Sequence, residues 1–372
     1  MSKIPLISVV MTSYNHSSYI AEAIQSVLNQ SFTDFELIII DDASQDDSAL
    51  VIKSFKDQRI IFIKNNINQG MIPSVNKGIE ISRGKYIAHI NSDDRFSCVD
   101  KLKKQLLYLE ANDSYAAVFT RVKVLDDNGL NLLEKNHFYY SIFDKERNKN
   151  RFKWLENFFH NGNSLCYPSV MIRRKVYEEL GYFNLAYTVM LDLEMWIRIC
   201  FKYEIHIIDE YLTEFRVGNN SQSCAADLLP VSKYEYQRVL ELFLEIENIS
   251  EFEVIFDRKV NNIFHSKMEE KLFIQLSIIE IAMTLGYEVF ALNSLFKIFN
   301  NPKSRHVVEN FSYLKFNSFK KSHLNNAYCN DSSLRKELKD MIRKESFIYK
   351  IMNPFWSVRR FFLKKAIKII LN

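Results

Sequence analysis

Between Ile7 and Val124 the chain alternates short apolar runs with segments of helical periodicity. The runs predicted to be strands are Ile7–Met11, Phe35–Ile40, Arg59–Ile63, Tyr86–Ile90 and Ala116–Val124. The segments predicted to be helices are Ser18–Gln30, Ser48–Phe55, Ile72–Ser82 and Lys101–Glu110. Because strands and helices follow one another in turn, we expect an α/β fold with a mainly parallel sheet that helices cover on both faces.

Polar clusters follow three of these strands. They are Thr12–Asn15, Asp41–Ser44 and Asn91–Asp94. In sheets of this kind, ligands bind beyond the carboxyl ends of the strands. One acidic turn would mean little, but three clusters that converge on one edge predict a binding site there.

Asp93 and Asp94 are adjacent carboxylates that repel each other unless a cation lies beside them. Oxygen ligands without Cys or His beside them are typical of Mg²⁺ or Mn²⁺ sites. Such an ion would bridge a diphosphate and offset its charge as it leaves. The alternative is structural, with Asp94 capping the helix that follows. The spacing alone leaves both open.

Two further acidic segments allow a functional and a structural interpretation. A carboxylate of Asp41 or Asp42 can accept hydrogen bonds from a base or a ribose hydroxyl, or it can stabilise a turn. Asp192 and Glu194 lie on different faces of a predicted helix, so they are not a carboxylate pair. One of them could be a general base that takes a proton from an acceptor hydroxyl. The alternative is a pair of acidic residues at the positive end of a helix dipole.

The composition is that of a folded protein, with 372 residues, 47% hydrophobic and 25% charged. A formal charge of +4 is too small for this length to predict nucleic-acid binding. The five cysteines are scattered, which argues against a disulfide framework and a zinc site and favours a cytoplasmic location. There is no signal-peptide pattern and no apolar run of the ~20 residues that span a bilayer.

The pattern changes near residues 224–230, after which the chain is predicted to be helical. We therefore expect a catalytic domain over residues 1–225 and a helical region over 226–372. Residues 354–372 form a predicted basic amphipathic helix, with aromatic and aliphatic residues gathered on one face. Such a helix suits an anionic membrane surface. Docking on the protein's own core, or on a second copy in a homodimer, are the alternatives.

Seven segments, taken in order, resemble family 2 glycosyltransferases, which are inverting enzymes of the GT-A fold. They are Ile7–Asn15, Ala23–Ser31, Phe35–Asp46, Asn68–Gly78, Arg83–Asp94, Pro168–Phe183 and Asp192–Arg198. The resemblance ends before about residue 230. It implies transfer of a sugar from a nucleotide-diphosphate donor, most often a UDP-sugar, to a saccharide or lipid-linked saccharide acceptor.

The resemblance also implies residue roles. The implied nucleotide-binding residues are Thr12, Tyr14, Asn15, Asp41, Asp42, Asn91 and Ser92. Asp93 and Asp94 would hold a divalent cation, Mn²⁺ or Mg²⁺, and Asp192 would be the general base. Glu194, Trp196 and Arg198 are candidates for the acceptor site.

Two positions depart from the family pattern. Asn91 stands where the metal-binding motif often has its first Asp, and Gly218 stands where a His often follows the segment Phe215–Arg216. Both departures leave open a domain that binds nucleotide without catalysis. A nucleotidyltransferase is the other alternative, although the turn after the first strand lacks the glycine-rich basic loop of that class. Nucleotide hydrolysis with donor, metal and acceptor would separate an enzyme from a binding domain.

Overall fold

The computed structural model describes residues 4–132, 138–218, 228–262 and 264–304. Compact units in the chain are Met1–Leu242 with Ser250–Lys259, and Phe243–Ile249 with Val260–Asn372. The boundary predicted at 225/226 falls outside the described residues, and so does the predicted amphipathic helix at 354–372. The helix α9 (Leu229–Val239) that follows the predicted boundary belongs to the first unit.

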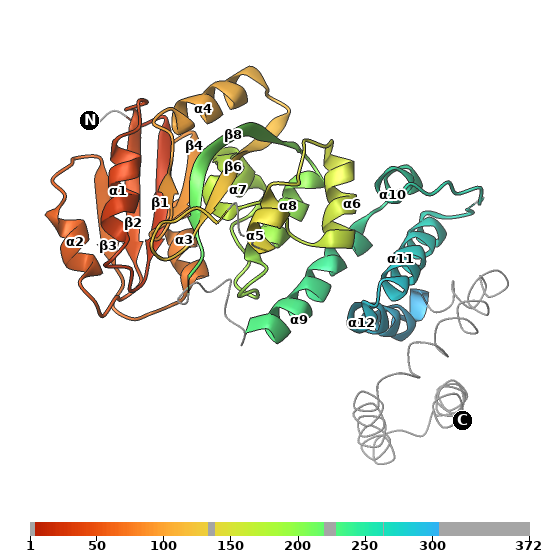
Figure 1. Cartoon of the computed structure of the whole chain (residues 1–372). Helices are drawn as coiled ribbons and strands as arrows, with labels where there is room; N and C mark the ends of the chain where they lie inside the picture. The colour runs from red at the N-terminus through yellow and green to blue at the C-terminus, as the bar shows by residue number, and fades with distance from the viewer. Residues whose placement is uncertain (1–3, 133–137, 219–227, 263, 305–372) are drawn as a thin grey trace, which may run out of the picture. The chain divides into compact units, whose positions relative to one another are not determined.

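The strands of the first unit form one eight-stranded sheet within the described residues (Figure 1), in the order β3-β2-β1-β4-β7-β6-β8-β5. Their bounds are β1 Ile7–Ser13, β2 Phe35–Asp41, β3 Ile60–Lys64, β4 Tyr86–Asn91, β5 Arg95–Phe96, β6 Tyr115–Leu125, β7 Met171–Arg173 and β8 Glu204–Arg216. β3, β2, β1 and β4 are parallel to one another, and β6 is parallel to β8. The short strands β7 and β5 pair antiparallel to their neighbours. The predicted mainly parallel sheet is confirmed.

The helices of the first unit include the four predicted from periodicity. Their bounds are α1 Ile20–Leu28, α2 Ser48–Ser54, α3 Met71–Ile81, α4 Lys101–Ala111, α5 Phe138–Phe143, α6 Arg151–Asn161, α7 Arg174–Leu180, α8 Leu191–Cys200 and α10 Ile249–Phe256, with a 3₁₀ turn η2 at Tyr167–Ser169. A further 3₁₀ segment, η5, spans Leu240–Glu245. In the second unit, α11 Lys267–Thr284 and α12 Glu288–Asn300 pack through Ile279, Met283 and Ala291. This agrees with the predicted helical C-terminal region. No described helix has the length and apolarity needed to cross a membrane.

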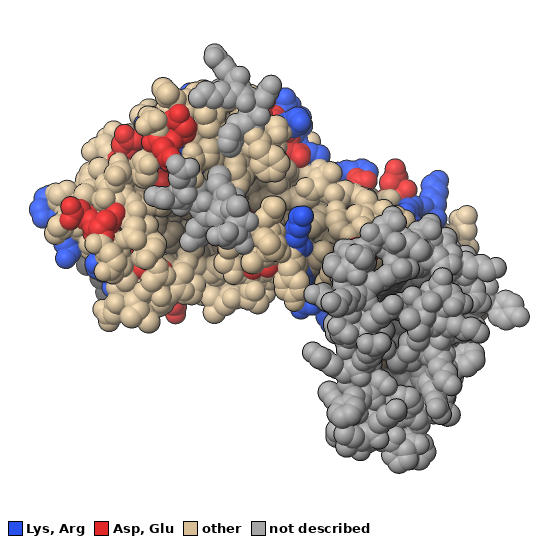
Figure 2. All heavy atoms as spheres, turned by 60° about the horizontal axis from the view of Figure 1, so that its bottom comes forward, with Lys and Arg blue, Asp and Glu red and all other residues tan. Residues whose placement is uncertain are grey.

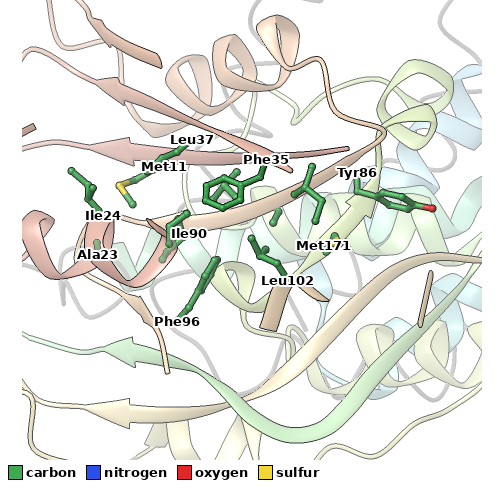
Figure 3. Packing of buried hydrophobic residues seen from close by; sticks show 14 of the residues in the cluster. Met11, Ala23, Ile24, Phe35, Leu37, Tyr86, Ile90, Phe96, Leu102 and Met171 are labelled. Atoms are coloured by element: carbon green, nitrogen blue, oxygen red, sulfur yellow. The ribbon is translucent and has the colours of Figure 1, made fainter. Parts of the chain in front are cut away.

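Alternate residues of the central strands point to opposite faces of the sheet. On one face, Met11, Leu37 and Ile90 pack against α1 and α4 (Figure 3). On the other face α3 comes close, since a β-carbon at Gly78 would lie 2.5 Å from a methyl group of Val10. The central strands are therefore apolar on both sides, which explains their almost unbroken apolar sequence.

Gly84 gives a test of how tightly the strands pack. A β-carbon there would lie 2.5 Å from the Ser8 nitrogen and 2.7 Å from the Ile7 carbonyl carbon, both in the backbone of β1. We expect Gly84→Ala to lower the free energy of unfolding by about 1–3 kcal/mol, because the backbone of β1 must move. Urea unfolding would show a lower midpoint with an unchanged slope. Ser114→Ala, at an exposed residue, is the control, and equal midpoints for the two variants would contradict the expectation.

Candidate active site

The loops after β1, β2 and β4 meet at one edge of the sheet, as the sequence predicted. Ser13 pairs with Asp41, and Thr12 pairs with Asn91, so the three strands end side by side. The loops then continue the ladder. The Asp42 amide donates to the Ser13 carbonyl at 2.8 Å, and the Ser92 amide donates to the Thr12 carbonyl at 3.3 Å.

Hydrogen bonds join the loops of β1 and β2 beyond the strand ends. The Asn15 amide donates to Ser44 Oγ at 3.0 Å, and Asn15 Oδ1 accepts from the Gln45 amide at 2.8 Å. Asn15 and Ala43 have positive φ angles of 55° and 64°. Residues with a β-carbon adopt this conformation at a cost, and it is enriched at functional sites. Tyr14 is exposed beside them and Thr12 is half-buried, so both can contact a ligand.

The carboxylates of Asp41 and Asp42 are buried and bonded to protein groups. Asp41 accepts from the hydroxyl and the amide of Ser44. Asp42 accepts from Asn65 Nδ2 at 2.8 Å and from the amides of Gln69 and Gly70, the latter at 2.7 Å. These are the turn-stabilising bonds of the structural alternative. Contact with a nucleotide through either residue stays a prediction.

The turn after β4 holds Asp93 and Asp94 in different environments. Asp94 is buried, and its oxygens accept from Asn91 Nδ2 at 2.9 Å and from the Arg216 amide at 2.8 Å. Burial, and then the charge of Asp93, raise the pKa of Asp94 well above its usual value. The side chain of Asp93 keeps 17% of its surface exposed. Asp94 therefore shapes the turn, and Asp93 is the carboxylate free to meet a ligand.

His16 lies beside Asp93, which the sequence did not predict. Its Nδ1 is 4.0 Å from Asp93 Oδ1 and 2.7 Å from the hydroxyl of Ser92. Burial raises the pKa of Asp93, while the charges of His16 and Arg216 oppose that rise. His16 also donates its amide to Ser48 Oγ at 3.0 Å, which ties the β1 loop to the start of α2. No sequence pattern distinguishes His16 from a surface histidine.

The side chains around Asp93 suit a metal ion that takes most of its ligands from water and a bound substrate, and few from the protein. Among the described residues, no group of three or more His, Cys, Asp or Glu side chains is arranged to hold a metal. Mg²⁺ in proteins commonly has one or two carboxylate ligands and takes its other ligands from water and substrate phosphates. One partly exposed carboxylate, Asp93, fits that mode, whereas Asp94 has both oxygens engaged.

Arg216, at the end of β8, joins the Asp93 turn to the turn after β6. Its guanidinium donates to the carbonyls of Asp93 at 3.0 Å and of Asp126 and Asp127 at 3.1 Å each. It also lies 4.6 Å from the centre of the Tyr19 ring. A β-carbon at Gly218 would come within 1.5 Å of Asp127 Oδ1. The place where the family pattern often has a histidine is therefore filled by the Asp127 carboxylate.

Asp192 lies in the first turn of α8. Its Oδ2 accepts from Asn163 Nδ2 at 2.6 Å and its Oδ1 accepts from the Leu193 amide at 2.7 Å. Burial raises the pKa of Asp192 to about 6, although these hydrogen bonds oppose the rise. A general base works best when its pKa is close to the working pH. Asn163 orients this carboxylate, and sequence reasoning missed it.

Cys166 lies in the electric field of both Asp94 and Asp192. Burial raises the pKa of the Cys166 thiol, and the charges of Asp94 and then Asp192 raise it further. Both carboxylates are therefore close enough to the Cys166 thiol for their charges to act on it.

Of the acceptor-site candidates on α8, Trp196 and Glu194 are buried and Arg198 is half-buried. Trp196 has no exposed surface and packs edge-on against Phe119, with ring centres 4.9 Å apart. Glu194 is buried and pairs with Arg198 at 2.8 Å, four residues further along the helix. Arg198 also donates to the Tyr182 carbonyl at 2.8 Å. These contacts stabilise α8. The four-residue spacing of Glu194 and Arg198 was the sequence signal that could have indicated their ion pair.

Comparisons with known proteins agree with this fold and site. Residues 8–181 match the model described as glycosyl transferase family 2. An uncharacterized glycosyltransferase of Methanocaldococcus jannaschii is 37% identical over 220 residues, which are 58% of this chain and 72% of the relative. The UDP-Glc:alpha-D-GlcNAc-diphosphoundecaprenol beta-1,3-glucosyltransferase WfaP of Escherichia coli is 27% identical over 224 residues, 59% of this chain and 80% of WfaP.

Among solved structures, Staphylococcus aureus TarS 1–349 in complex with UDP-GlcNAc is similar with a TM-score of 0.55 and 16% identity. The similarity covers 82% of this chain and 91% of that chain, and it shows the fold alone. The chain is a glycosyltransferase of the GT-A fold and belongs to glycosyl transferase family 2.

Proposed function

We propose that the protein moves a sugar from a UDP-sugar to an acceptor hydroxyl, with inversion at the anomeric carbon. The observation that carries this proposal is Asp192, a carboxylate oriented by Asn163 at the start of α8 and with a pKa raised to about 6. The proposed donor follows from the names of WfaP and of the TarS complex, which contain UDP-glucose and UDP-GlcNAc.

The proposed reaction is a single displacement. Asp192 takes the proton of the acceptor hydroxyl, and the acceptor oxygen forms a bond to the anomeric carbon. The bond between that carbon and the diphosphate oxygen breaks, so the nucleotide leaves as its diphosphate. Tyr14 and Asn15, in the loop after β1, are the proposed contacts of the nucleotide, together with the backbone around Ser92.

A divalent cation, Mn²⁺ or Mg²⁺, is part of the proposal. Asp93 would hold it, and the ion would stabilise the charge that develops on the leaving diphosphate. Asp94 and Arg216 would keep the Asp93 turn in place through the hydrogen bonds described above.

The proposed biological role is the synthesis of a bacterial surface polysaccharide or glycan. WfaP, by its name, uses a lipid-diphosphate-linked sugar as acceptor, and a candidate teichuronic acid biosynthesis glycosyltransferase, TuaG, of Bacillus subtilis is 31% identical over 233 residues. A cytoplasmic location, membrane contact through residues 354–372 and a homodimer stay predictions.

On the described part of the face in Figure 2, acidic and basic side chains are interspersed among large uncharged areas.

The proposed reaction can be tested with UDP-, GDP- and dTDP-sugars, Mn²⁺, and undecaprenyl-diphosphate-linked sugars as acceptors. We expect release of the nucleoside diphosphate and a product whose anomeric configuration, determined by NMR, is opposite to that of the donor. Retention of configuration would contradict the single displacement. Tight binding of nucleotide with neither transfer nor hydrolysis would favour the non-catalytic binding domain.

The pH dependence of the reaction follows from Asp192. The base is active when deprotonated, and its pKa is raised to about 6. We therefore expect kcat/KM to fall as the pH drops through about 6, tenfold per pH unit below it. The measurement is initial rate at limiting donor across the acid range, with circular dichroism at each pH to verify folding. A rate that stays constant down to the usual aspartate pKa of about 4 would contradict the assignment.

A further inference from the structure

Helix α9 contributes a buried carboxylate to the loop that precedes Asp192. Glu235 is 5% exposed. Its Oε1 accepts from the Thr188 amide at 2.6 Å, and its Oε2 accepts from the amides of Val189 at 2.7 Å and Met190 at 2.9 Å. α9 lies beyond residues 8–181, the segment that matches the family model. Three hydrogen bonds to one carboxylate are a specific arrangement, since bonds to a charged group are stronger than bonds between neutral groups.

These amides lead directly into the helix that carries the proposed base. Met190 is the N-cap residue of α8, and its side chain makes no capping hydrogen bond. The first amides of a helix have no partner within the helix and carry a partial positive charge. Glu235 supplies a negative charge and the acceptor atoms for the amides of residues 188–190, which lead into α8. It thereby fixes the backbone two residues before Asp192.

The same helix also supports the residue that orients Asp192. The single proton of the Tyr236 hydroxyl is shared between the carbonyls of Phe158, at 3.0 Å, and Phe159, at 2.8 Å, in the last turns of α6, beside α9 (Figure 1). The residue after α6 is the C-cap Gly162, which has a φ angle of 79°. The next residue, Asn163, donates to Asp192 Oδ2 at 2.6 Å. Neighbouring residues of α9 therefore hold both segments that meet at Asp192.

The far end of the loop has its own anchor. Asn76, on α3, accepts from the Phe183 amide at 3.0 Å and donates to the Phe183 carbonyl at 2.8 Å. The loop 184–190 is thus fixed by a core helix at its start and by α9 at its end. Removing the α9 anchor would release the end that carries the proposed base, while the loops of β1, β2 and β4 would keep their own hydrogen bonds.

We propose that α9 belongs to the catalytic domain because it holds the segments around Asp192 in place, and that Glu235 is a positioning residue for Asp192. The inference rests on the proposed function of Asp192 as general base. Displacement of a catalytic group by about 1 Å can lower a rate on the order of 10²-fold. The loss of Glu235 should therefore lower turnover without weakening donor binding.

The first test measures the loop itself, without any ligand. In hydrogen exchange of the full chain, we expect Glu235→Gln and Glu235→Ala to speed exchange of the amides of residues 188–190 by about tenfold or more, because charge-assisted bonds are lost. Lys233→Gln is the matched control, since it also changes one charge on α9 but at an exposed residue. Unchanged exchange in both Glu235 variants would overturn the inference, whatever the role of Asp192.

The second test couples Glu235 to Asp192. UDP release from UDP-glucose and UDP-GlcNAc with Mn²⁺ is measured for the wild type, Glu235→Gln, Asp192→Asn and the double variant. We expect Glu235→Gln to lower kcat about 10- to 100-fold with donor KM unchanged, and to add no further loss in the Asp192→Asn background. Independent losses that multiply would overturn the positioning role. If Asp192→Asn alone keeps full turnover, the proposed function fails, and the exchange result still decides whether Glu235 holds the loop.

Discussion

Replacing Asp192 with asparagine is expected to lower kcat on the order of 10²- to 10⁴-fold, the usual contribution of a general base. Asparagine keeps the size of the side chain and one of the two acceptor oxygens that Asn163 and the Leu193 amide use, but it cannot take a proton. The loops that would hold the nucleotide are joined to each other by hydrogen bonds such as that from the Asn15 amide to Ser44. The hydrogen bonds of Asp192 go instead to Asn163 and to the Leu193 amide. Donor affinity, measured by isothermal titration with UDP and Mn²⁺, should therefore stay within about twofold of the wild type.

Asp113→Asn is the control for this substitution, because the Asp113 side chain is 98% exposed. It should leave both turnover and donor affinity unchanged. The assignment of Asp192 is wrong if Asp192→Asn loses donor affinity while turnover at saturating donor is retained. The acid limb of the pH profile near pH 6 should also disappear from the residual activity of Asp192→Asn, since the titrating group is gone.

Much of the sheet could be predicted from the sequence, because its central strands are buried on both faces. Ile38 and Ile39 point to opposite sides and both have no exposed surface, so the run needs apolar residues at every position. The antiparallel strand β7 is a different case. It has three residues, and its place between β4 and β6 depends on pairing with residues far away in the sequence. No local pattern carries that information.

The location of the candidate site could be predicted from the sequence, but the contacts of its side chains could not. The strand-end clusters meet as expected, because parallel strands end at one edge. A carboxylate in a sequence, however, does not reveal whether its oxygens face a ligand or its own backbone. Contact of Asp42 with a nucleotide stays a prediction, and in the structure its oxygens accept from the Gln69 and Gly70 amides. Those amides lie 27 and 28 residues further along the chain, so the sequence alone cannot show which groups the Asp42 oxygens face.

Arg216 illustrates the opposite case, in which a residue given no role by the sequence holds the turn that carries Asp93. The resemblance directed attention to Gly218, where a histidine is often found, and not to Arg216, two residues earlier. In the structure the buried guanidinium joins the Asp93 turn to the Asp126–Asp127 turn through carbonyl groups. A buried guanidinium is retained at a desolvation cost that its hydrogen bonds must offset. Its position indicates that the geometry of the Asp93 turn depends on β8.

Removal of the Asp93 carboxylate should abolish the effect of metal on nucleotide binding. The wild type is expected to gain thermal stability from UDP and Mn²⁺ together, by about 2.7 kcal/mol at a ligand concentration 100 times the dissociation constant. Asp93→Ala should lose the part of this gain that requires Mn²⁺ and keep whatever UDP gives alone, because Asp93 is the partly exposed carboxylate of the turn. Asp47→Ala, which removes an exposed charge that makes no capping bond at α2, is the control. An undiminished Mn²⁺-dependent shift in Asp93→Ala would mean that the cation is held elsewhere. Asp94 could not replace Asp93 without breaking its bonds to Asn91 and Arg216, and that cost would reduce the stability gained on Mn²⁺ binding.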